Sequence, residues 1–98
     1  MAPAKLSDAQ VSEWIAANPN WTLGSGGDRI LAVYEFSDFA DAMAFMNAVA
    51  PQCDQMNHHP EWRNIYNKVW VELTTHDSGG LTESDLQLAR FMDAAATG

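Results

Sequence analysis

The chain alternates between two hydrophobic periods, and each period predicts one kind of element. Three stretches repeat their apolar residues every three or four positions, which is typical of helices that bury one side, and they are residues 7–18, 38–50 and 82–95. Four shorter segments are rich in β-branched and aromatic residues, which favours strands, and they are residues 21–23, 29–36, 62–66 and 69–75. The predicted order is helix, strand, strand, helix, strand, strand, helix.

This order predicts the fold class. Short turns inside each strand pair imply hairpins, so the strands form a four-stranded antiparallel sheet with the helices packed on one face, an α+β fold. A chain of 98 residues is long enough for one hydrophobic core. We expect a single domain over residues 1–98, in which residues 1–5 form a loose N-terminal tail.

Capping residues fix where the helices begin. Ser7 and Gln10 form a capping box at the start of the first helix, and Thr82 and Asp85 occupy the corresponding positions of the last. The middle helix is expected to run to about Ala50, where the following proline bends or restarts it.

The apolar side of the middle helix covers roughly 160° of a helical wheel, which is wider than a core stripe requires. One interpretation is a deeply buried helix. The other is that one flank packs against a second subunit, and we expect a homodimer or a dimer of dimers. The residues concerned are Phe39, Ala42, Met43, Phe45, Met46 and Val49.

The second hairpin has a predicted register. A two-residue loop at positions 67–68 pairs Tyr66 with Val69, and the same register carried back places His59 opposite His76. Directly opposed residues have Cβ atoms about 4.5–5.5 Å apart. Arg63 then lies opposite Glu72, and the side chains expected to face the core are Trp62, Tyr66, Val69, Val71 and Leu73.

All three histidines, His58, His59 and His76, therefore lie near the open end of this hairpin. Imidazole titrates near neutral pH, which suits it to acid–base catalysis. Three histidines can also hold zinc with an open fourth position. Adjacent residues of an extended chain point to opposite faces, however, so His58 and His59 are poorly placed for one ion, and we expect no metal.

Composition excludes several classes of function. Thirteen acidic against five basic side chains give a net charge of −8, which repels phosphate backbones and argues against nucleic-acid binding. No apolar run approaches the roughly 18 residues of a membrane-spanning helix. Cys53 is the only cysteine, so no internal disulfide can form, and we expect a cytoplasmic protein.

One pattern of spaced residues adds a resemblance. It consists of an acidic residue, three residues, His-His-Pro, an aromatic residue, nine residues, a histidine, eight residues and an aspartate. In this chain the pattern is filled by Asp54, His58, His59, Pro60, Tyr66, His76 and Asp85. With the segments HHPEW, TTHD and GLTESD, the chain resembles the pterin-4a-carbinolamine dehydratase family over roughly residues 6–95. Asn57 and Ser84 depart from the pattern, where aspartate and arginine are common.

The resemblance implies a reaction. Members of the family dehydrate 4a-hydroxytetrahydrobiopterin to the quinonoid dihydropterin and so recycle the pterin of aromatic amino acid hydroxylases. It implies that His58 and His76 act as acid and base while His59 holds the pterin, with no cofactor and no metal. The other expected substrate contacts are Asn57, Trp62, Thr74, Thr75 and Asp77, and the supporting residues are Asp54, Pro60 and Asp85.

A second class of function stays open. Members of the resembled family also serve as the dimerisation partner of a homeodomain transcription factor. Such a non-catalytic binding module would use helix surfaces and would not need the histidines. The complete histidine set favours the enzyme.

Overall fold

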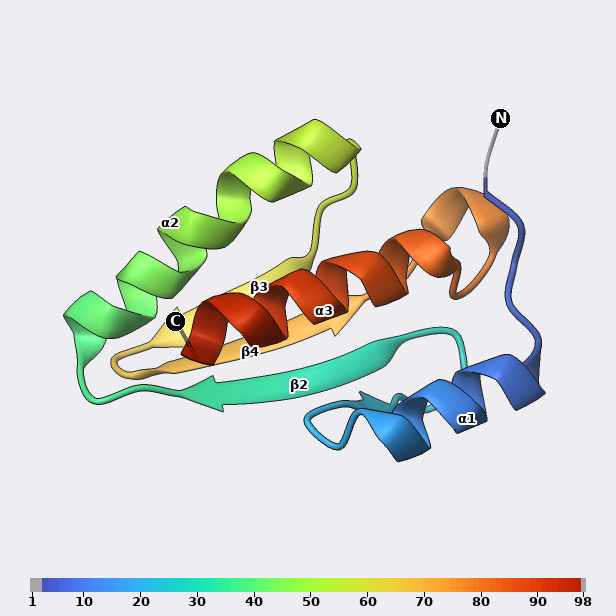
Figure 1. Ribbon diagram of the computed structural model, residues 1–98, viewed down its shortest axis with the longest axis horizontal. Coiled ribbons are helices and arrows are strands. Elements are labelled where there is room, and N and C mark those ends of the chain that lie inside the picture. The colour runs from blue at the N-terminus through green and yellow to red at the C-terminus, as the bar shows by residue number, and fades with distance from the viewer. Residues whose placement is uncertain (1–2, 98) are drawn as a thin grey trace.

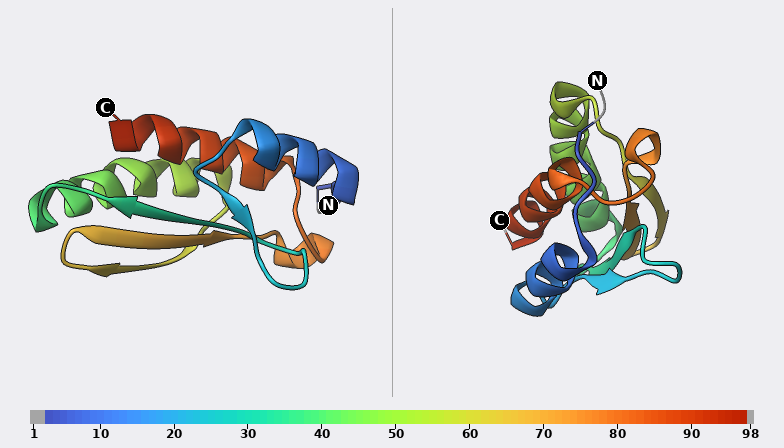
Figure 2. Two further views of the ribbon diagram at one scale, coloured as in Figure 1. Left: turned by 90° about the horizontal axis from the view of Figure 1, so that it is seen from below. Right: turned by 90° about the vertical axis from the view of Figure 1, so that its right-hand side faces the viewer.

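Helices and sheet form two layers, with all the helices on one face of the sheet (Figures 1 and 2). The computed structural model describes residues 3–97. Its elements are α1 (Asp8–Ala17), β1 (Thr22–Leu23), β2 (Ile30–Glu35), α2 (Phe39–Met56), β3 (Glu61–Ile65), β4 (Lys68–Leu73), the 3-10 turn η1 (His76–Ser78) and α3 (Glu83–Thr97). The strands pair antiparallel in the order β1-β2-β4-β3, which confirms the predicted fold class.

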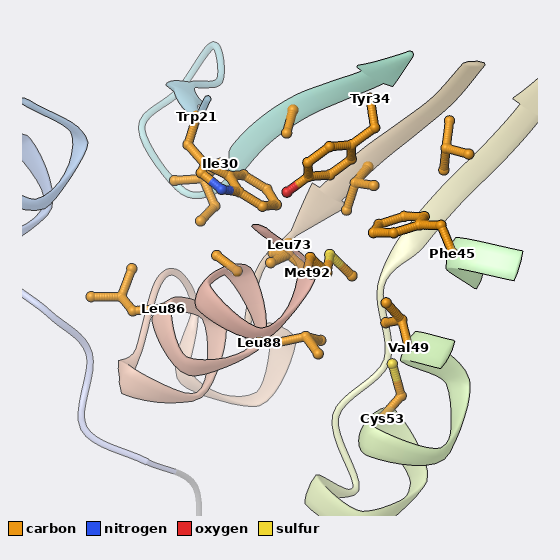
Figure 3. Close-up of a cluster of buried hydrophobic side chains, with 14 of the residues drawn as sticks. Trp21, Ile30, Tyr34, Phe45, Val49, Cys53, Leu73, Leu86, Leu88 and Met92 are labelled. Carbon is orange, nitrogen blue, oxygen red and sulfur yellow. The ribbon is translucent and has the colours of Figure 1, made fainter. Parts of the chain in front are cut away.

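The core lies between the sheet and the helices (Figure 3). Strand β2 shows how the sequence builds it, because alternate side chains of a strand point to opposite faces. Ile30, Ala32 and Tyr34 are buried, whereas Val33 and Glu35 face away from the helices and are exposed. Helices α2 and α3 close the core with their apolar sides, through Ala42, Phe45, Val49, Cys53, Leu86, Leu88, Ala89 and Met92. Within residues 3–97, no helix combines the length and apolar character needed to cross a membrane.

Helix α1 begins as predicted. The Gln10 backbone N–H donates to the Ser7 hydroxyl at 3.1 Å, and the Ser7 N–H donates to the Gln10 side chain at 2.8 Å, so the capping box is complete. The chain before it was expected to be a loose tail, and residues 1 and 2 lie outside the described residues. Residues 3–5 are exposed and lack regular structure, but Pro3 accepts a hydrogen bond from the Ser78 hydroxyl.

Helix α2 is longer than predicted, because it continues through Pro51 to Met56. Proline removes one helical hydrogen bond, which favours a helix end. Val49 and Cys53, on either side of it, are 0% and 2% exposed, so core packing holds both halves of the helix in line. The helix ends at Asn57, whose φ of 51° is left-handed.

The register of the β3–β4 hairpin differs from the prediction. Arg63 lies opposite Trp70 rather than Glu72, and Ile65 opposite Lys68, so the loop is formed by Tyr66 and the residue after it. A shift of two residues keeps each side chain within the strands on its predicted face, because the strand period is two. Val69, Val71 and Leu73 are accordingly buried and Trp62 is partly buried against the core. Tyr66 was predicted to face the core, which is wrong, because it lies in the loop and is 63% exposed.

Side-chain hydrogen bonds from asparagines explain this register. Asn67 donates from its side chain to the Phe36 carbonyl at 2.9 Å, and its own carbonyl accepts the Phe36 N–H at 2.8 Å. Asn64 donates to the carbonyls of Tyr66 and Lys68, at 3.0 and 2.8 Å. The Asn67 contacts tie the loop to the end of β2, and the Asn64 contacts hold the hairpin closed. The loop therefore begins one position earlier in the chain than the sequence pattern indicates.

A polar cluster joins the sheet to α3. The Asp93 carboxylate accepts hydrogen bonds from the Tyr34 hydroxyl at 2.6 Å, from the Trp21 indole N–H at 3.2 Å and from the Asn20 amide at 3.1 Å. Burial, and then the neighbouring Asp93 carboxylate, raise the pKa of Tyr34 above its ordinary value. The phenol is therefore held in its neutral, donating form.

This cluster predicts a loss of stability at alkaline pH. A group whose pKa is higher in the folded than in the unfolded state contributes stability that is complete below its unfolded pKa, about 10 for tyrosine, and is lost as the pH rises above it. Tyr34→Phe should lower the free energy of unfolding by about 1–3 kcal/mol at pH 7. The variant should then lose less stability than the parent between about pH 9.5 and 11. Urea unfolding at a series of pH values measures both effects.

Tyr66→Phe is the matched control, because that exposed tyrosine makes no side-chain hydrogen bond within residues 3–97. It should leave the stability profile unchanged. An equal alkaline loss in Tyr34→Phe and the parent would contradict the assignment.

Candidate active site

His58 lies where α2 ends and reaches across to the start of α3. Its backbone N–H donates to the Cys53 carbonyl at 3.0 Å, which holds it against the last turn of α2. Its Nε2 lies 2.6 Å from Oδ1 of Asp85, in the first turn of α3. The His58 side chain is only 13% exposed and that of Asp85 is fully buried. The predicted site therefore includes a nearly dry histidine–carboxylate pair.

The buried carboxylate of Asp85 is fully engaged. Its Oδ2 accepts the Thr82 backbone N–H at 2.9 Å and the Thr75 hydroxyl at 2.8 Å. The Thr82 hydroxyl lies 2.8 Å from that of Thr75 and accepts the Ser84 N–H at 3.3 Å. No buried side-chain polar atom of residues 3–97 lacks a partner. Burying a carboxylate is costly unless hydrogen bonds replace its water, and here the cap of α3 and the end of β4 supply them.

This network selects one form of the His58 ring. An ionised carboxylate can only accept, so Nε2 carries the proton that is shared with Asp85. In the neutral ring Nδ1 is then left with a free lone pair. His58 also lines a pocket, and Nδ1 is the ring nitrogen that the contact with Asp85 leaves without a partner from that carboxylate. The tautomer follows from the hydrogen-bond network.

The pocket has a volume of about 390 Å³, and its lining residues come from the N-terminal segment, the end of α2, the turn η1 and the start of α3. Most of its lining is polar. The lining residues are Pro3, Met56, Asn57, His58, Thr75, Asp77 and Ser84. Four of these were predicted as substrate contacts from the sequence, namely Asn57, His58, Thr75 and Asp77. Ser84 stood out in the sequence only as a departure from the motif, and nothing in the sequence pointed to Pro3 or Met56.

His59 points to a different partner. Its Nε2 lies 2.9 Å from Oδ1 of Asp54, on the last turn of α2, and both side chains are more than half exposed. The two adjacent histidines therefore diverge, one towards α3 and the other back along α2. Within residues 3–97, no group of three or more histidine, cysteine or carboxylate side chains is arranged to hold a metal ion.

His76 is not opposite His59, and this part of the prediction was wrong. Strand β4 ends at Leu73, and the chain closes a turn in which Thr75 bridges to Gly80. His76 begins η1 and is exposed. It lies between Thr75 and Asp77, which both line the pocket, but it is not itself a lining residue.

Two other predicted contacts lie elsewhere. The Thr74 hydroxyl donates to the Asp28 carbonyl at 2.5 Å, so it supports the β1–β2 turn. Trp62 packs partly against the core, and it also borders a larger hollow of about 700 Å³ that is lined by Val33 and Trp70 among others. The Arg63 guanidinium stacks there on Trp70, 4.1 Å from the ring centroid.

Comparisons with known proteins decide the family. Residues 4–95 match the family described as "Pterin 4 alpha carbinolamine dehydratase". The chain belongs to the pterin-4a-carbinolamine dehydratase family. A relative from Burkholderia cenocepacia that carries the family's name is 48% identical over 93 residues, covering 95% of this chain and 91% of its own. Another, from Sinorhizobium medicae, is 47% identical and covers 100% of this chain and 93% of its own.

Solved structures agree with this family fold. The crystal structure of a "transcriptional coactivator/pterin dehydratase" from Brucella melitensis superposes with a TM-score of 0.90 at 38% identity, covering 94% of this chain and 98% of its own. A "pterin dehydratase-like protein" described as a RuBisCO assembly factor of the α-carboxysome has a TM-score of 0.68 at 22% identity, covering 79% and 89%. The second likeness shows the fold alone.

The single cysteine of this chain is a buried core residue next to the site. Cys53 is 2% exposed, and burial, followed by the Asp54 charge, raises the pKa of its thiol. Thiolates are the reactive form of cysteine, so the thiol serves as a small core side chain. Its backbone carbonyl, which accepts the His58 N–H, is its contribution to the site.

The His58–Asp85 pair predicts a ring tautomer that can be measured. At about pH 8, where an ordinary imidazole is neutral, ¹⁵N NMR of histidine-labelled protein should show His58 protonated on Nε2. Asp85→Asn should abolish this preference, because an amide can donate as well as accept. It should also lower the free energy of unfolding by about 1–3 kcal/mol, since buried donors lose their acceptor.

Asp54→Asn is the control for this measurement, because it alters the exposed partner of His59 and leaves His58 untouched. An Nδ1-protonated His58 in the parent protein would refute the network as described.

Proposed function

We propose that the protein dehydrates a 4a-hydroxytetrahydropterin, 4a-hydroxytetrahydrobiopterin in the first instance, to the quinonoid dihydropterin. Family membership supports the reaction class. The observation that carries the proposal is a histidine that is held by a buried carboxylate through Nε2 and that lines a polar pocket. A pterin ring, with nitrogen and oxygen atoms around its edge, suits the side chains of Asn57, Asp77 and Ser84 that line this pocket.

The reaction needs two proton transfers and nothing else. The lone pair of N5 forms the C4a=N5 bond and expels the hydroxyl from C4a. One protein group protonates the leaving oxygen, and another takes the proton from N5, so the sum is the loss of one water. A positioned acid or base contributes typically about 10²–10⁴-fold to the rate.

We assign the base to His58 and the acid to His76. Nδ1 of His58 has the lone pair that accepts the N5 proton, and Asp85 then stabilises the imidazolium across its 2.6 Å contact. His76, exposed at the start of η1 between Thr75 and Asp77, supplies the proton to the leaving hydroxyl. His59, oriented by Asp54, holds the pterin. In this scheme Asn57 and Ser84 tune affinity, and the product feeds the pterin cycle of an aromatic amino acid hydroxylase.

Kinetics of histidine variants test the roles. His76→Ala and His58→Gln should each lower kcat by about 10²-fold or more with little change in KM. Glutamine is chosen at position 58 because its amide still donates to Asp85 but cannot accept a proton. His59→Ala should mainly raise KM. The assay uses chemically prepared 4a-carbinolamine, metal-chelated protein and subtraction of the spontaneous rate.

Thermal unfolding of each variant serves as the control for folding. The double variant His58→Gln/His76→Ala should lose less transition-state stabilisation than the sum of the losses in the two single variants, because residues that act as a unit are not additive. Full kcat in folded His58→Gln and His76→Ala would show that the acid–base assignment is wrong. Loss of activity on chelation, with recovery on adding zinc, would replace it with a metal mechanism.

Protein binding is the second candidate function. The Brucella melitensis relative is described as a transcriptional coactivator as well as a pterin dehydratase. Helix α2 carries a partly uncovered apolar flank here, with Phe39 49% exposed and Met43 and Met46 half-buried. Strand β3 is an edge strand of the sheet. We propose that these surfaces pair copies of the chain, as a homodimer or a dimer of dimers, and that any other protein partner docks on the same flank.

Sedimentation tests self-association. The parent protein at micromolar concentration should exceed the mass of a 10.8 kDa monomer. Phe39→Glu should shift it towards monomer by placing a charge in the apolar contact. Phe91→Glu is the matched control, because Phe91 is a 37% exposed phenylalanine on α3. A parent that sediments only as a monomer would rule out the assembly.

A further inference from the structure

The segment Pro3–Leu6, here called the N-terminal strap, is fastened to the turn beside the pocket. The Ser78 hydroxyl donates to the Pro3 carbonyl, and the Leu6 N–H donates to the Leu81 carbonyl at 2.8 Å. Between these points the Lys5 side chain lies across Gly80, where an added Cβ would come within 2.8 Å of the lysine Cε. The strap is therefore held at both of its ends against residues 78–81 (Figure 1).

Those anchor points flank the residues that build the site. Ser78 follows Asp77, a lining residue, and Leu81 precedes Thr82, whose N–H binds the carboxylate of Asp85. Pro3 itself lines the pocket. The strap thus reaches the pocket through Pro3, although it lies far from the other lining residues in sequence.

The strap supplies a surface that the pocket otherwise nearly lacks. Apart from Pro3 and Met56, every lining side chain is polar. A flat heterocycle presents polar edges and apolar faces, so it needs apolar contacts above or below the ring as well as polar partners around it. Pro3 is suited to such a contact because its rigid ring loses no rotamer entropy on packing.

We propose that the N-terminal strap is the wall on which the face of the pterin ring packs, and that it sets affinity for the ring rather than the rate of dehydration. This inference rests on the function proposed above. During the reaction, charge changes at N5 and at the oxygen on C4a. In the proposed mechanism these are the atoms to and from which the histidines transfer protons. Contact with the ring face is the same in the substrate and in the transition state, so its loss should raise KM and leave kcat almost unchanged.

The first test removes the part of the strap that precedes Leu6. A variant lacking residues 2–5 keeps Leu6 and the capping box of Ser7, so α1 retains its start. Its KM for the 4a-carbinolamine should rise about ten-fold, the lower range for losing an apolar contact in a pocket, with kcat within about two-fold of the parent. Ser78→Ala, which releases only the Pro3 end, should raise KM by a smaller factor.

Ser37→Ala is the matched control. Its hydroxyl also makes one exposed side-chain hydrogen bond, to Asp41 at 2.8 Å, but at the opposite end of α2 from the pocket. It should leave KM unchanged. Thermal unfolding of the three variants checks that none has lost its fold.

The second test asks whether a ligand orders the strap. Trypsin cleaves after Lys5, and the rate can be followed by mass spectrometry. Saturating 7,8-dihydrobiopterin, a stable pterin, should slow this cleavage several-fold in the parent, while cleavage after Arg90, on α3, keeps its rate. A strap with a purely structural role would be cleaved equally fast with and without the pterin.

The outcomes separate the two proposals. An active parent, with the strapless variant at parental KM or with unprotected Lys5, overturns the strap's role and leaves the dehydratase standing. A parent that neither dehydrates the carbinolamine nor protects Lys5 in the presence of the pterin overturns both. A lowered kcat at parental KM would mean that the strap acts in the chemical step, which contradicts the inference.

Discussion

The buried carboxylate of Asp85 is the contact on which the rest of the site depends. It accepts hydrogen bonds from three parts of the chain, namely the residue before its own helix, Thr82, the segment after β4 through Thr75, and the end of α2 through His58. A carboxylate in a dry position is tolerated only when all these donors are present, so the helix cap and the histidine depend on each other. The same atoms therefore cap the start of α3 and determine which nitrogen of the histidine is held by the carboxylate.

Much of the architecture is readable from the sequence because its local signals agree. The capping box at Ser7, the alternation along β2 and the paired Thr82 and Asp85 each predict an element that the structure contains. Parity is the most robust of these signals, since the buried positions of β4 were predicted correctly from a register that was wrong by two residues. What a period of two cannot fix is the position of the loop, which asparagine side chains decide through contacts distant in sequence.

The site was predictable in its membership more than in its geometry. The spaced motif included both His58 and Asp85. Extending the predicted hairpin, however, placed His59 opposite His76 and indicated no contact between His58 and Asp85. Extrapolation failed because β3 begins only at Glu61, so the histidines precede the strand and follow the end of a helix that runs past its proline. The contact between His58 and Asp85 spans 27 residues and two elements, and no local pattern encodes it.

Asn57 illustrates how narrowly one position in such a site is constrained. Its backbone has a φ of 51°, a conformation that glycine, asparagine and aspartate adopt at least cost, and its residue lines the pocket beside His58. Only two of those three residues bring a polar side chain, and they differ by a single charge in nearly the same volume. Exchange between them alters the electrostatic potential in the pocket without requiring a change in the main chain. The left-handed turn that ends α2 therefore accepts either asparagine or aspartate at position 57. Natural variation between the two changes the charge beside the pocket while the backbone conformation is kept.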